Sequence, residues 1–421
     1  MNNKFDVIVI GAGAAGCVAA GFAAENGNSV LLLDKNAKVG RKVLITGKGR
    51  CNVTNNCDVK DFMLFVRTNP RFMYSALSSF SPADTMEFFE NLGVKLKTER
   101  GNRVFPLSDK SSDITDALFK FIRRNKVDFR QECVTEILAV NNSVFGVKTK
   151  TGTYLSDNII LATGGKSYPL TGSDGSGYEL ARRLGHSIVS PQPSLVPIVT
   201  CEKWCADLQG LALKNVTVKL FKNGSGKPIF DELGEMLFTH FGVSGPLILS
   251  ASSCIDISTI TEYKLCIDMK PALDEKLLDS RILRDFDKYL NRDIQNALVD
   301  LLPQKMIPIV LELSNIQPNL KTNQITKEQR HSLLNNIKSL TIHPKSFRPI
   351  EEAIITSGGV KTTEIDPKTM QSKLVSGLYF AGEIIDVDAF TGGFNLQIAF
   401  STGHLCGSSI LRRFSDESYS Y

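Results

Sequence analysis

The sequence predicts an α/β fold with a parallel sheet, on three observations near its N-terminal end. Residues 6–10 form a short apolar run that is typical of a buried strand. The glycine-rich turn Gly11-Ala12-Gly13-Ala14-Ala15-Gly16 follows at once and opens a helix-like stretch. Residues 29–33 form a second apolar run, which ends on the carboxylate of Asp34. Two strands joined by a helix in this order make a βαβ unit, so the first domain is expected to be Rossmann-like.

Each part of this unit suits a dinucleotide. Gly11 permits the tight turn, Gly13 lets the backbone approach a pyrophosphate, and Gly16 lets the helix pack on the strand. The helix N-terminus offers unpaired N–H groups and positive potential to phosphate. Asp34, about twenty residues further on, can accept hydrogen bonds from an adenosine ribose. The sequence therefore predicts a site for an ADP moiety.

The composition excludes several other classes of protein. A chain of 421 residues with 42% hydrophobic and 22% charged residues is an ordinary globular protein with about two or three domains. A net charge of +5 without a long basic run disfavours nucleic acid as a partner. Nine scattered cysteines and five dispersed histidines predict neither a metal site nor disulfides. No apolar run reaches the roughly twenty residues that span a bilayer, and Asp6 interrupts any secretory signal, so we expect a cytoplasmic protein without a membrane partner.

The middle of the chain changes character twice, which predicts an insertion. Residues 195–269 alternate apolar and polar positions in short runs, the pattern of an antiparallel, barrel-like sheet. Residues 273–340 have a helical period, with a capping box that begins at Thr326, and the α/β pattern returns near residue 353. The expected domains are a nucleotide-binding domain in two parts (1–191 and 356–421), a barrel-like domain (192–272 and 341–355) and a helical insertion (273–340).

Three further segments favour FAD over NAD as the dinucleotide. Residues 161–165 end a strand that passes close to the cofactor, and Glu383 follows a glycine where ribityl or ribose hydroxyls are expected. The helix after Gly392 and Gly393 can point its first amides at the pyrimidine edge of a flavin and stabilise its reduced anionic form. The glycine-rich residues 171–177 do not follow a strand directly, so no built-in nicotinamide domain is expected. The reductant is then an external NAD(P)H that docks transiently, or another donor.

The chain also resembles a known family. The strings that carry the resemblance are Gly40-Arg41-Lys42, residues 46–55 with a specific Gly-Arg-Cys-Asn, residues 162–169, the pattern Thr-His-x-Gly-x-Ser-Gly-Pro within 237–246, residues 356–360 and residues 382–397. Over essentially the whole chain they resemble the bacterial FAD-dependent oxidoreductases called BaiN-like, YhiN-like or aminoacetone oxidase family flavoproteins. The resemblance implies a FAD domain interrupted by a β-barrel-like domain that carries a small helical insertion. It also implies a distant relation to the flavin domains of succinate dehydrogenase and fumarate reductase.

The candidate site residues follow from these segments. Arg41, Lys42 and Arg50 suit phosphate, with a solvated basic loop as the alternative. Cys51 is expected either near the flavin ring, which it would modulate, or as a buried, inert thiol, and is assigned no catalytic role. The cofactor-binding set is Gly11, Gly13, Ala14, Ala15, Gly16, Asp34, Lys35, Arg41, Lys42, Thr46, Gly49, Arg50, Cys51, Asn52, Val134, Ala162, Thr163, Gly164, Gly165, Gly382, Glu383, Asp388, Gly392, Gly393, Asn395 and Gln397. The catalytic candidates are His240, as a proton donor or substrate-orienting group, and Tyr168, as a donor to a substrate carbonyl; for His240 the alternative is a structural histidine.

The leading functional hypothesis is a FAD-dependent oxidoreductase that transfers hydride between flavin N5 and a small organic substrate in the cleft between the barrel and the FAD domain. The substrate is either an activated alkene, as in enone reduction, or an amine that is oxidised. The alternatives are a FAD-dependent RNA-modifying protein and a redox-sensing flavoprotein. No feature of the sequence sets the oligomeric state.

Overall fold

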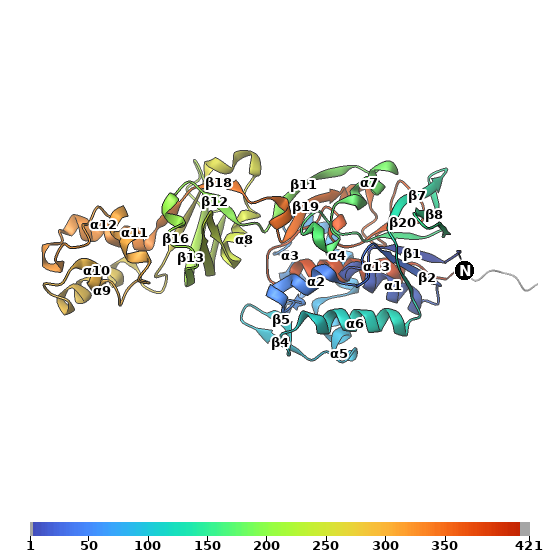
Figure 1. Ribbon diagram of the computed structural model, residues 1–421, viewed down its shortest axis with the longest axis horizontal. Helices are drawn as coiled ribbons and strands as arrows, with labels where there is room; N and C mark the ends of the chain where they lie inside the picture. The colour runs from blue at the N-terminus through green and yellow to red at the C-terminus, as the bar shows by residue number, and fades with distance from the viewer. Residues whose placement is uncertain (1–2, 413–421) are drawn as a thin grey trace, which may run out of the picture. The chain divides into compact units, whose positions relative to one another are not determined.

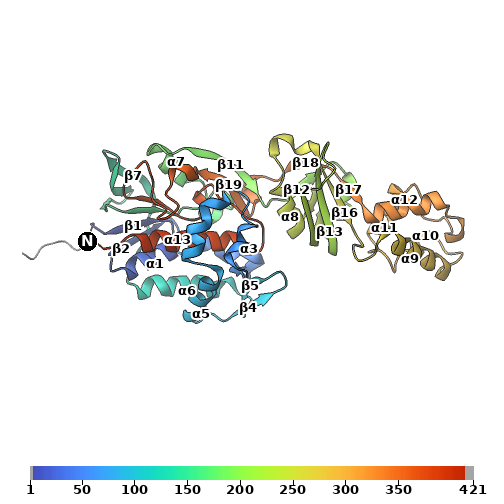
Figure 2. The ribbon, with the colours of Figure 1, turned by 180° about the vertical axis from the view of Figure 1, so that it is seen from behind.

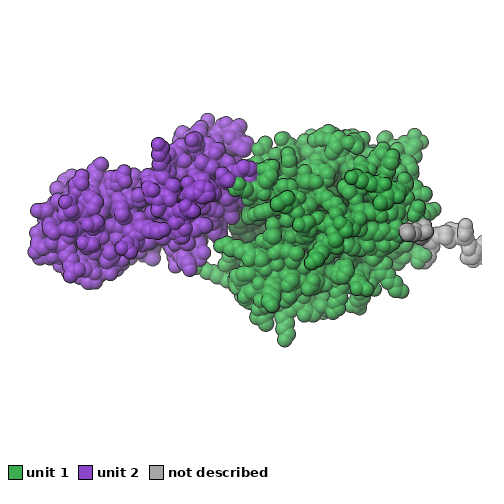
Figure 3. All heavy atoms as spheres, viewed as in Figure 1, with its two compact units in different colours: residues 1–194, 350–421 green, residues 195–349 purple. Residues whose placement is uncertain are grey.

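The computed structural model describes residues 3–412, and the chain folds into two compact units (Figure 1). Unit 1 takes the chain up to Ser194 and again from Ile350 on, and unit 2 is Leu195–Pro349 (Figure 3). The sequence predicts that the inserted part begins at residue 192 and ends at residue 355. Unit 1 reaches further than expected because strand β11 (Ile188–Ser194) pairs along its last three residues with strand β19 (Ile355–Val360).

The core of unit 1 is a parallel sheet of five strands in the order β20-β10-β1-β2-β6. The central strand β1 (Val7–Ile10) is fully buried, as are the apolar residues of its neighbours, because both faces of a parallel sheet are covered. The sheet combines strands from the N-terminal and C-terminal parts of unit 1. The other strands are β2 (Val30–Asp34), β6 (Asp128–Gln131), β10 (Ile159–Leu161) and β20 (Leu378–Phe380).

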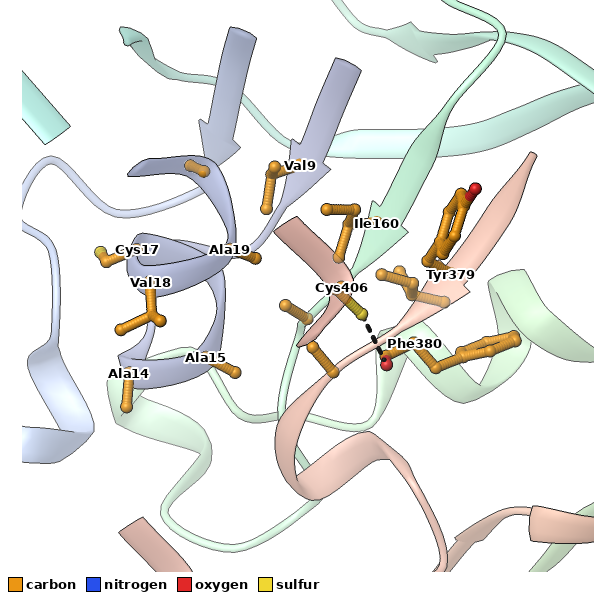
Figure 4. Packing of buried hydrophobic residues seen from close by; sticks show 14 of the residues in the cluster. Val9, Ala14, Ala15, Cys17, Val18, Ala19, Ile160, Tyr379, Phe380 and Cys406 are labelled. Atoms are coloured by element: carbon orange, nitrogen blue, oxygen red, sulfur yellow. Dashed lines mark hydrogen bonds between the residues drawn. The ribbon is translucent and has the colours of Figure 1, made fainter. Parts of the chain in front are cut away.

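Two helices from opposite ends of the chain pack together against this sheet. They are α1 (Ala14–Glu25), which is apolar all round, and α13 (Phe394–Ser409). A Cβ on Gly403 would lie 2.4 Å from the carbonyl oxygen of Ala15, and one on Gly407 would lie 2.4 Å from that of Ala19. The backbones therefore touch through glycine and alanine. Figure 4 shows the small side chains of α1 near Val9 of β1, and the Cys406 thiol of α13 donating to the Phe380 carbonyl of β20 at 3.1 Å.

The rest of unit 1 surrounds this core. Its smaller sheets are β3 (Thr54–Asn55) with β5 (Arg103–Pro106) and β4 (Leu96–Glu99), and β7 (Val134–Val140) with β8 (Ser143–Thr149) and β9 (Thr153–Leu155). Its other helices are α2 (Arg41–Ile45), α3 (Val59–Met63), α4 (Tyr74–Ser79), α5 (Pro82–Asn91), α6 (Ser111–Arg124) and α7 (Ser176–Arg183).

Unit 2 consists of a curved sheet and a group of helices (Figure 2). Its antiparallel sheet has the order β17-β16-β13-β14-β15-β12-β18. The two outer strands, β17 (Leu340–Ile342) and β18 (Pro344–Phe347), are separated in the chain only by His343, so the sheet curves until its ends are neighbours. The remaining elements are β12 (Ile198–Thr200), β13 (Ala212–Lys222), β14 (Phe230–Thr239), β15 (Gly242–Ser244), β16 (Tyr263–Asp268), α8 (Pro246–Ser252), α9 (Glu275–Lys288), α10 (Ile294–Ala297), α11 (Met306–Leu313) and α12 (Lys327–Lys338).

The helices α9 to α12 lie between β16 and β17 in the chain, where the sequence predicts a helical insertion. Thr326 caps α12 with the predicted reciprocal contact to Gln329. Within residues 3–412 no helix is both long and apolar enough to cross a bilayer.

A buried histidine in unit 1 makes stability depend on pH. The side chain of His186 is fully buried, with Nδ1 3.2 Å from Glu364 Oε2 and Nε2 2.9 Å from Ser372 Oγ. Burial lowers the pKa of His186 below its ordinary value, although the Glu364 carboxylate acts in the opposite sense. Because the pKa is lower in the folded state, the unfolded chain takes up the proton first. The contribution of His186 is complete above about pH 6.5 and is lost as the pH falls.

We expect the free energy of unfolding of the wild type to fall more steeply between pH 7 and about pH 5.5 than that of His186→Gln. Urea unfolding at a series of pH values measures both slopes. His331→Gln removes an exposed histidine of unit 2 and is expected to keep the wild-type slope. Parallel curves for wild type and His186→Gln would contradict the prediction.

Candidate functional site

The glycine turn between β1 and α1 is closely packed at two positions and open at a third. Gly11 has φ +103°, and a Cβ there would lie 2.5 Å from the carbonyl oxygen of Ala162. A Cβ on Gly16 would lie 1.8 Å from the carbonyl oxygen of Gly11. A Cβ on Gly13 would meet no atom within 4 Å, and no side chain caps α1 at this residue. The turn therefore leaves free space in front of the uncapped N–H groups of α1.

Asp34 lies beside this turn at the end of β2. Its Oδ2 accepts the N–H of Ala12 at 2.7 Å, and its Oδ1 accepts the N–H of Asn36 at the same distance. Arg41 donates to Asn36 Oδ1 at 2.6 Å, and Lys35 pairs with Asp174 at 2.6 Å. Hydrogen bonds and an ion pair thus hold Asp34, Lys35 and Arg41 close to the N-terminus of α1, at the carboxyl edge of the parallel sheet.

A polar cluster ties three distant segments together at the same edge. Lys42 Nζ lies 2.6 Å from Glu383 Oε2 and 2.7 Å from Ser167 Oγ. Glu383 Oε1 accepts the Thr356 N–H at 2.8 Å and the Ser167 hydroxyl at 3.0 Å. A Cβ on Gly165 would lie 2.5 Å from Thr356 Oγ1, so the segment that follows β10 packs directly against this cluster. Ser167 and Thr356 lie in the quoted family strings but were not among the predicted site residues.

The ion pair between Lys42 and Glu383 is expected to contribute to stability, because both side chains are only about a fifth exposed to solvent. We expect Glu383→Gln to lower the free energy of unfolding by about 1–2 kcal/mol, because the Lys42 ammonium loses its charged partner. The double variant Lys42→Met/Glu383→Gln should recover part of the loss. Urea denaturation measures all three proteins. Glu179→Gln breaks an exposed pair on α7 and should leave stability nearly unchanged; an equal loss there would contradict the argument.

The N-terminus of α13 is a second uncapped helix start. Gly392 and Gly393 have φ of +127° and +98°, and a Cβ on Gly393 would lie 2.4 Å from the carbonyl carbon of Thr54. No side chain caps the helix. The helices α1 and α13 run parallel, because Gly403 faces Ala15 and Gly407 faces Ala19. Gly403 is the tenth residue of α13 and Ala15 the second of α1, so α13 begins eight residues, about 12 Å, beyond the start of α1.

Several predicted cofactor residues bond mainly to the protein itself. The Asp388 carboxylate is 2% exposed and accepts hydroxyl hydrogen bonds from Thr68, Ser194 and Ser357. Asn395 exchanges hydrogen bonds with the backbone of Ala389. Gln397 is fully buried and bonds to Thr54, Phe80 and Ser401.

The predicted residues in the loop that follows α2 differ in their surroundings. Arg50 pairs with Glu99 at 2.5 Å and Asp109 at 2.6 Å, and its guanidinium stacks on Phe105, so its charge is already balanced. Cys51 is fully buried, and burial raises the pKa of its thiol to about 12, which keeps it neutral and unreactive. Two buried side-chain oxygens, Asn52 Oδ1 in this loop and Thr163 Oγ1 after β10, have no hydrogen-bond partner in the described chain.

The remaining predicted residues are placed as follows. Thr46 bonds to the carbonyl of Val43, a Cβ on Gly49 would meet open space, and Val134 begins β7 in a smaller sheet. Gly164 and Gly382 have positive φ. Tyr168 is half-buried in unit 1, and burial raises the pKa of its phenol. His240 is exposed in unit 2, between β14 and β15. In the described part of the chain no group of three or more His, Cys, Asp or Glu could hold a metal ion.

These residues fit FAD. An uncapped helix start with open space at Gly13 suits a pyrophosphate, and Asp34 beside it suits a ribose. The orphan oxygens of Asn52 and Thr163 need a partner that the described protein does not provide. The second uncapped start, about 12 Å further along, suits the flavin end of an extended dinucleotide.

Comparison with known proteins decides the family. The model of the HI0933-like protein Rossmann domain matches residues 5–409. The chain belongs to the HI0933-like family. The predicted membership of a FAD-dependent oxidoreductase family and the predicted fold class are both confirmed.

Three full-length relatives bear functional names. The chain is 32% identical to the 3-dehydro-bile acid delta(4,6)-reductase of Clostridium scindens, over 96% of this chain and 98% of that protein. It is 30% identical to the ribosomal RNA dihydrouridine synthase of Escherichia coli, over 97% and 98%. It is 32% identical to the protein of the same name from Haemophilus influenzae, over 98% and 100%.

Solved structures show the fold alone. A 3-ketosteroid-delta4-(5alpha)-dehydrogenase from Rhodococcus jostii aligns with a TM-score of 0.50 at 15% identity and covers 97% of both chains. A 3-ketosteroid delta1-dehydrogenase from Sterolibacterium denitrificans aligns with a TM-score of 0.50 at 12% identity, over 97% of this chain and all of that one.

Proposed function

We propose that this protein is a FAD-dependent reductase of carbon–carbon double bonds that are conjugated to a carbonyl group. The observation that carries the FAD part of the proposal is the pair of uncapped helix starts, α1 and α13, staggered by about 12 Å at one edge of the sheet. The reaction type is supported by the names of the full-length relatives. A delta(4,6)-reductase of a 3-oxo steroid and a dihydrouridine synthase both saturate an alkene that a neighbouring carbonyl activates.

The chain's own residues divide the work of holding FAD. The first N–H groups of α1 would bind the pyrophosphate, with Gly13 leaving room for it, and Asp34 would bind the ribose. The first N–H groups of α13 would face the pyrimidine edge and favour negative charge there. Lys42 and Glu383 fix the intervening segments at the sheet edge. Bound FAD, once reduced by an external donor, would supply the hydride that such an alkene accepts at its β-carbon.

Reduction of the alkene also needs a proton at the α-carbon. His240 remains our proposal for the proton donor or for a group that orients the substrate. Tyr168 remains our proposal for a donor to the substrate carbonyl; burial raises the pKa of its phenol further above the ordinary value. NAD(P)H remains the proposed external reductant of the flavin.

Anaerobic spectroscopy tests the proposal. The FAD-loaded protein is first reduced with NADH, NADPH or, if neither acts, dithionite, and then mixed with 2-cyclohexen-1-one. Return of the oxidised flavin spectrum with formation of cyclohexanone is the expected result. Bleaching by benzylamine, with peroxide formed on re-aeration and no reaction with the enone, would contradict it and favour amine oxidation.

A second candidate substrate is a uracil base within RNA. It is favoured because two of the three named full-length relatives are ribosomal RNA dihydrouridine synthases. Uracil carries the same activated alkene as an enone. Formation of dihydrouridine in an RNA transcript incubated with the reduced protein, measured by mass spectrometry of nucleosides, tests this candidate directly.

A further inference from the structure

We propose that residues 413–421 of this chain bind in an open groove along the exposed face of α6. The segment 413–421 lies outside the described residues, and the groove is formed entirely by unit 1. None of the residues that line the groove belongs to the predicted cofactor-binding or catalytic set, so this contact goes beyond the proposed function.

The groove has two parts, which share Asp116 and Lys120 of α6. The first part has a volume of about 600 Å³ and lies between α6, the loop before β4 and the loop after β5. The second part has a volume of about 490 Å³ and continues beside Phe119, Arg123 and Arg124 to the end of the helix. Because these α6 residues recur every three or four positions, they share one face of the helix. This face and the two loops form the α6 groove (Figure 1).

The α6 groove combines exposed apolar side chains with cations that lack a carboxylate partner. Leu107 is 56% exposed and Phe119 is 39% exposed. Four exposed cations line the groove, and within residues 3–412 no carboxylate lies in ion-pair distance of any of them: Lys95, Lys120, Arg123 and Arg124. They outnumber the carboxylates of the groove, Asp113 and Asp116, and Asp113 already accepts the Ser108 hydroxyl at 2.6 Å. The groove therefore carries an excess of positive charge.

The segment 413–421 has a complementary composition. Its two carboxylates, Asp416 and Glu417, are flanked by the aromatic residues Phe414 and Tyr419, and Arg413 is its only cation. Carboxylates suit the unpaired cations of the α6 groove, and aromatic rings suit its exposed apolar side chains. One exposed ion pair contributes little by itself, so the charged and aromatic contacts have to act together.

The last described residues of the chain lie beside one end of the groove. A Cβ on Gly27, just after α1, would lie 3.6 Å from Arg412 Cδ. Asn125, the residue that follows α6, donates to the Glu25 carboxylate at the end of α1 at 3.3 Å. The ends of α1 and α6 are therefore neighbours, and the chain leaves Arg412 close to the Arg124 end of the α6 groove.

The segment is long enough to follow the groove. Nine residues of extended chain reach about 30 Å, whereas residues 113–124 of α6 span about 16 Å. Because residue 412 is fixed beside the groove, the effective concentration of the segment there is on the order of millimolar. Weak contacts are then enough to occupy the groove.

Site-specific photo-crosslinking in the full-length protein tests this docking. The variant Tyr419→p-benzoylphenylalanine carries a photoreactive group in the segment, and mass spectrometry of the digested protein locates its products. We expect crosslinks within one chain to fall mainly on residues 92–95, 107–108 and 113–124. Their yield should fall several-fold when KCl is raised from about 0.05 M to about 0.5 M, because salt screens exposed charges.

Reversal of charge on each side of the contact makes the test specific. Lys120→Glu/Arg124→Glu should lower the crosslink yield about fivefold. Adding Asp416→Lys/Glu417→Lys to this variant should restore the yield, because the same attraction is made with the signs exchanged. Far-UV circular dichroism checks that each variant is folded.

A matched control changes the same number of charges elsewhere in unit 1. Lys60→Glu/Lys148→Glu reverses two exposed cations on α3 and β8 and should keep the wild-type yield. Equal yields in the control and in Lys120→Glu/Arg124→Glu would overturn the proposal. Crosslinks that join two chains would also overturn it and assign the segment to a second copy. Absence of crosslinks to the groove in folded protein would overturn it as well and leave the groove to an acidic segment of another protein. Since enone turnover is not the readout, failure here is distinct from failure of the proposed function.

Discussion

Replacing Gly16 with alanine is expected to lower the free energy of unfolding by about 3 kcal/mol or more and to abolish FAD retention. The reason is steric, because the new Cβ would lie 1.8 Å from the carbonyl oxygen of Gly11. That oxygen is backbone and cannot move aside without opening the β1–α1 turn. Urea denaturation and the flavin absorbance of the purified protein measure the two effects.

Gly13→Ala is the matched variant, three residues away in the same turn. Its Cβ would meet no protein atom within 4 Å, and the backbone at this position, with φ −79°, accepts alanine. We expect stability to change by less than about 1 kcal/mol, while the affinity for FAD falls because the methyl group occupies the proposed pyrophosphate space. If Gly13→Ala bound FAD as the wild type does, the proposed position of the pyrophosphate would be wrong.

Gly403→Ala is expected to have the second large effect, because it separates the two helices that define the site. A Cβ at this position would lie 2.4 Å from the carbonyl oxygen of Ala15 on α1. We expect a loss of about 2–3 kcal/mol of stability and weaker FAD binding, since the starts of α1 and α13 would no longer be held in register. Thermal unfolding and fluorescence titration with FAD measure the two losses.

Ser409→Ala provides the comparison for Gly403→Ala. It removes one hydroxyl contact to the carbonyl of Leu405 within α13 and leaves the contact with α1 intact. We expect an effect below about 1 kcal/mol and unchanged FAD affinity. Equal behaviour of the two variants would show that contact between the helices does not set the site.

The nucleotide-binding half of the fold could be predicted because its signals are local. The buried strands, the glycine turn and Asp34 are encoded within 34 residues, and each glycine has a steric reason that the structure bears out at Gly11 and Gly16. The barrel-like sheet and the helices after it likewise follow from periodicity in short windows.

The polar contacts at the sheet edge could not be predicted in the same way. Lys42 and Glu383 are 341 positions apart, and nothing local to either residue indicates the other. Asp388 was expected at the cofactor, but its carboxylate is buried among hydroxyls of three other segments. Arg50 was expected to bind phosphate, and its neutralising partners, Glu99 and Asp109, are known only from the fold. The role of each as a cofactor ligand stays a prediction.

The central claim is that the starts of α1 and α13 together bind one extended FAD. Equilibrium titration of the flavin-free protein with FAD and with FMN tests it most directly, with flavin fluorescence as the signal. The account predicts one FAD per chain and at least a hundredfold weaker binding of FMN, because FMN lacks the adenylate half that α1 would hold. Equal affinity for the two flavins, or no binding of either, would contradict it.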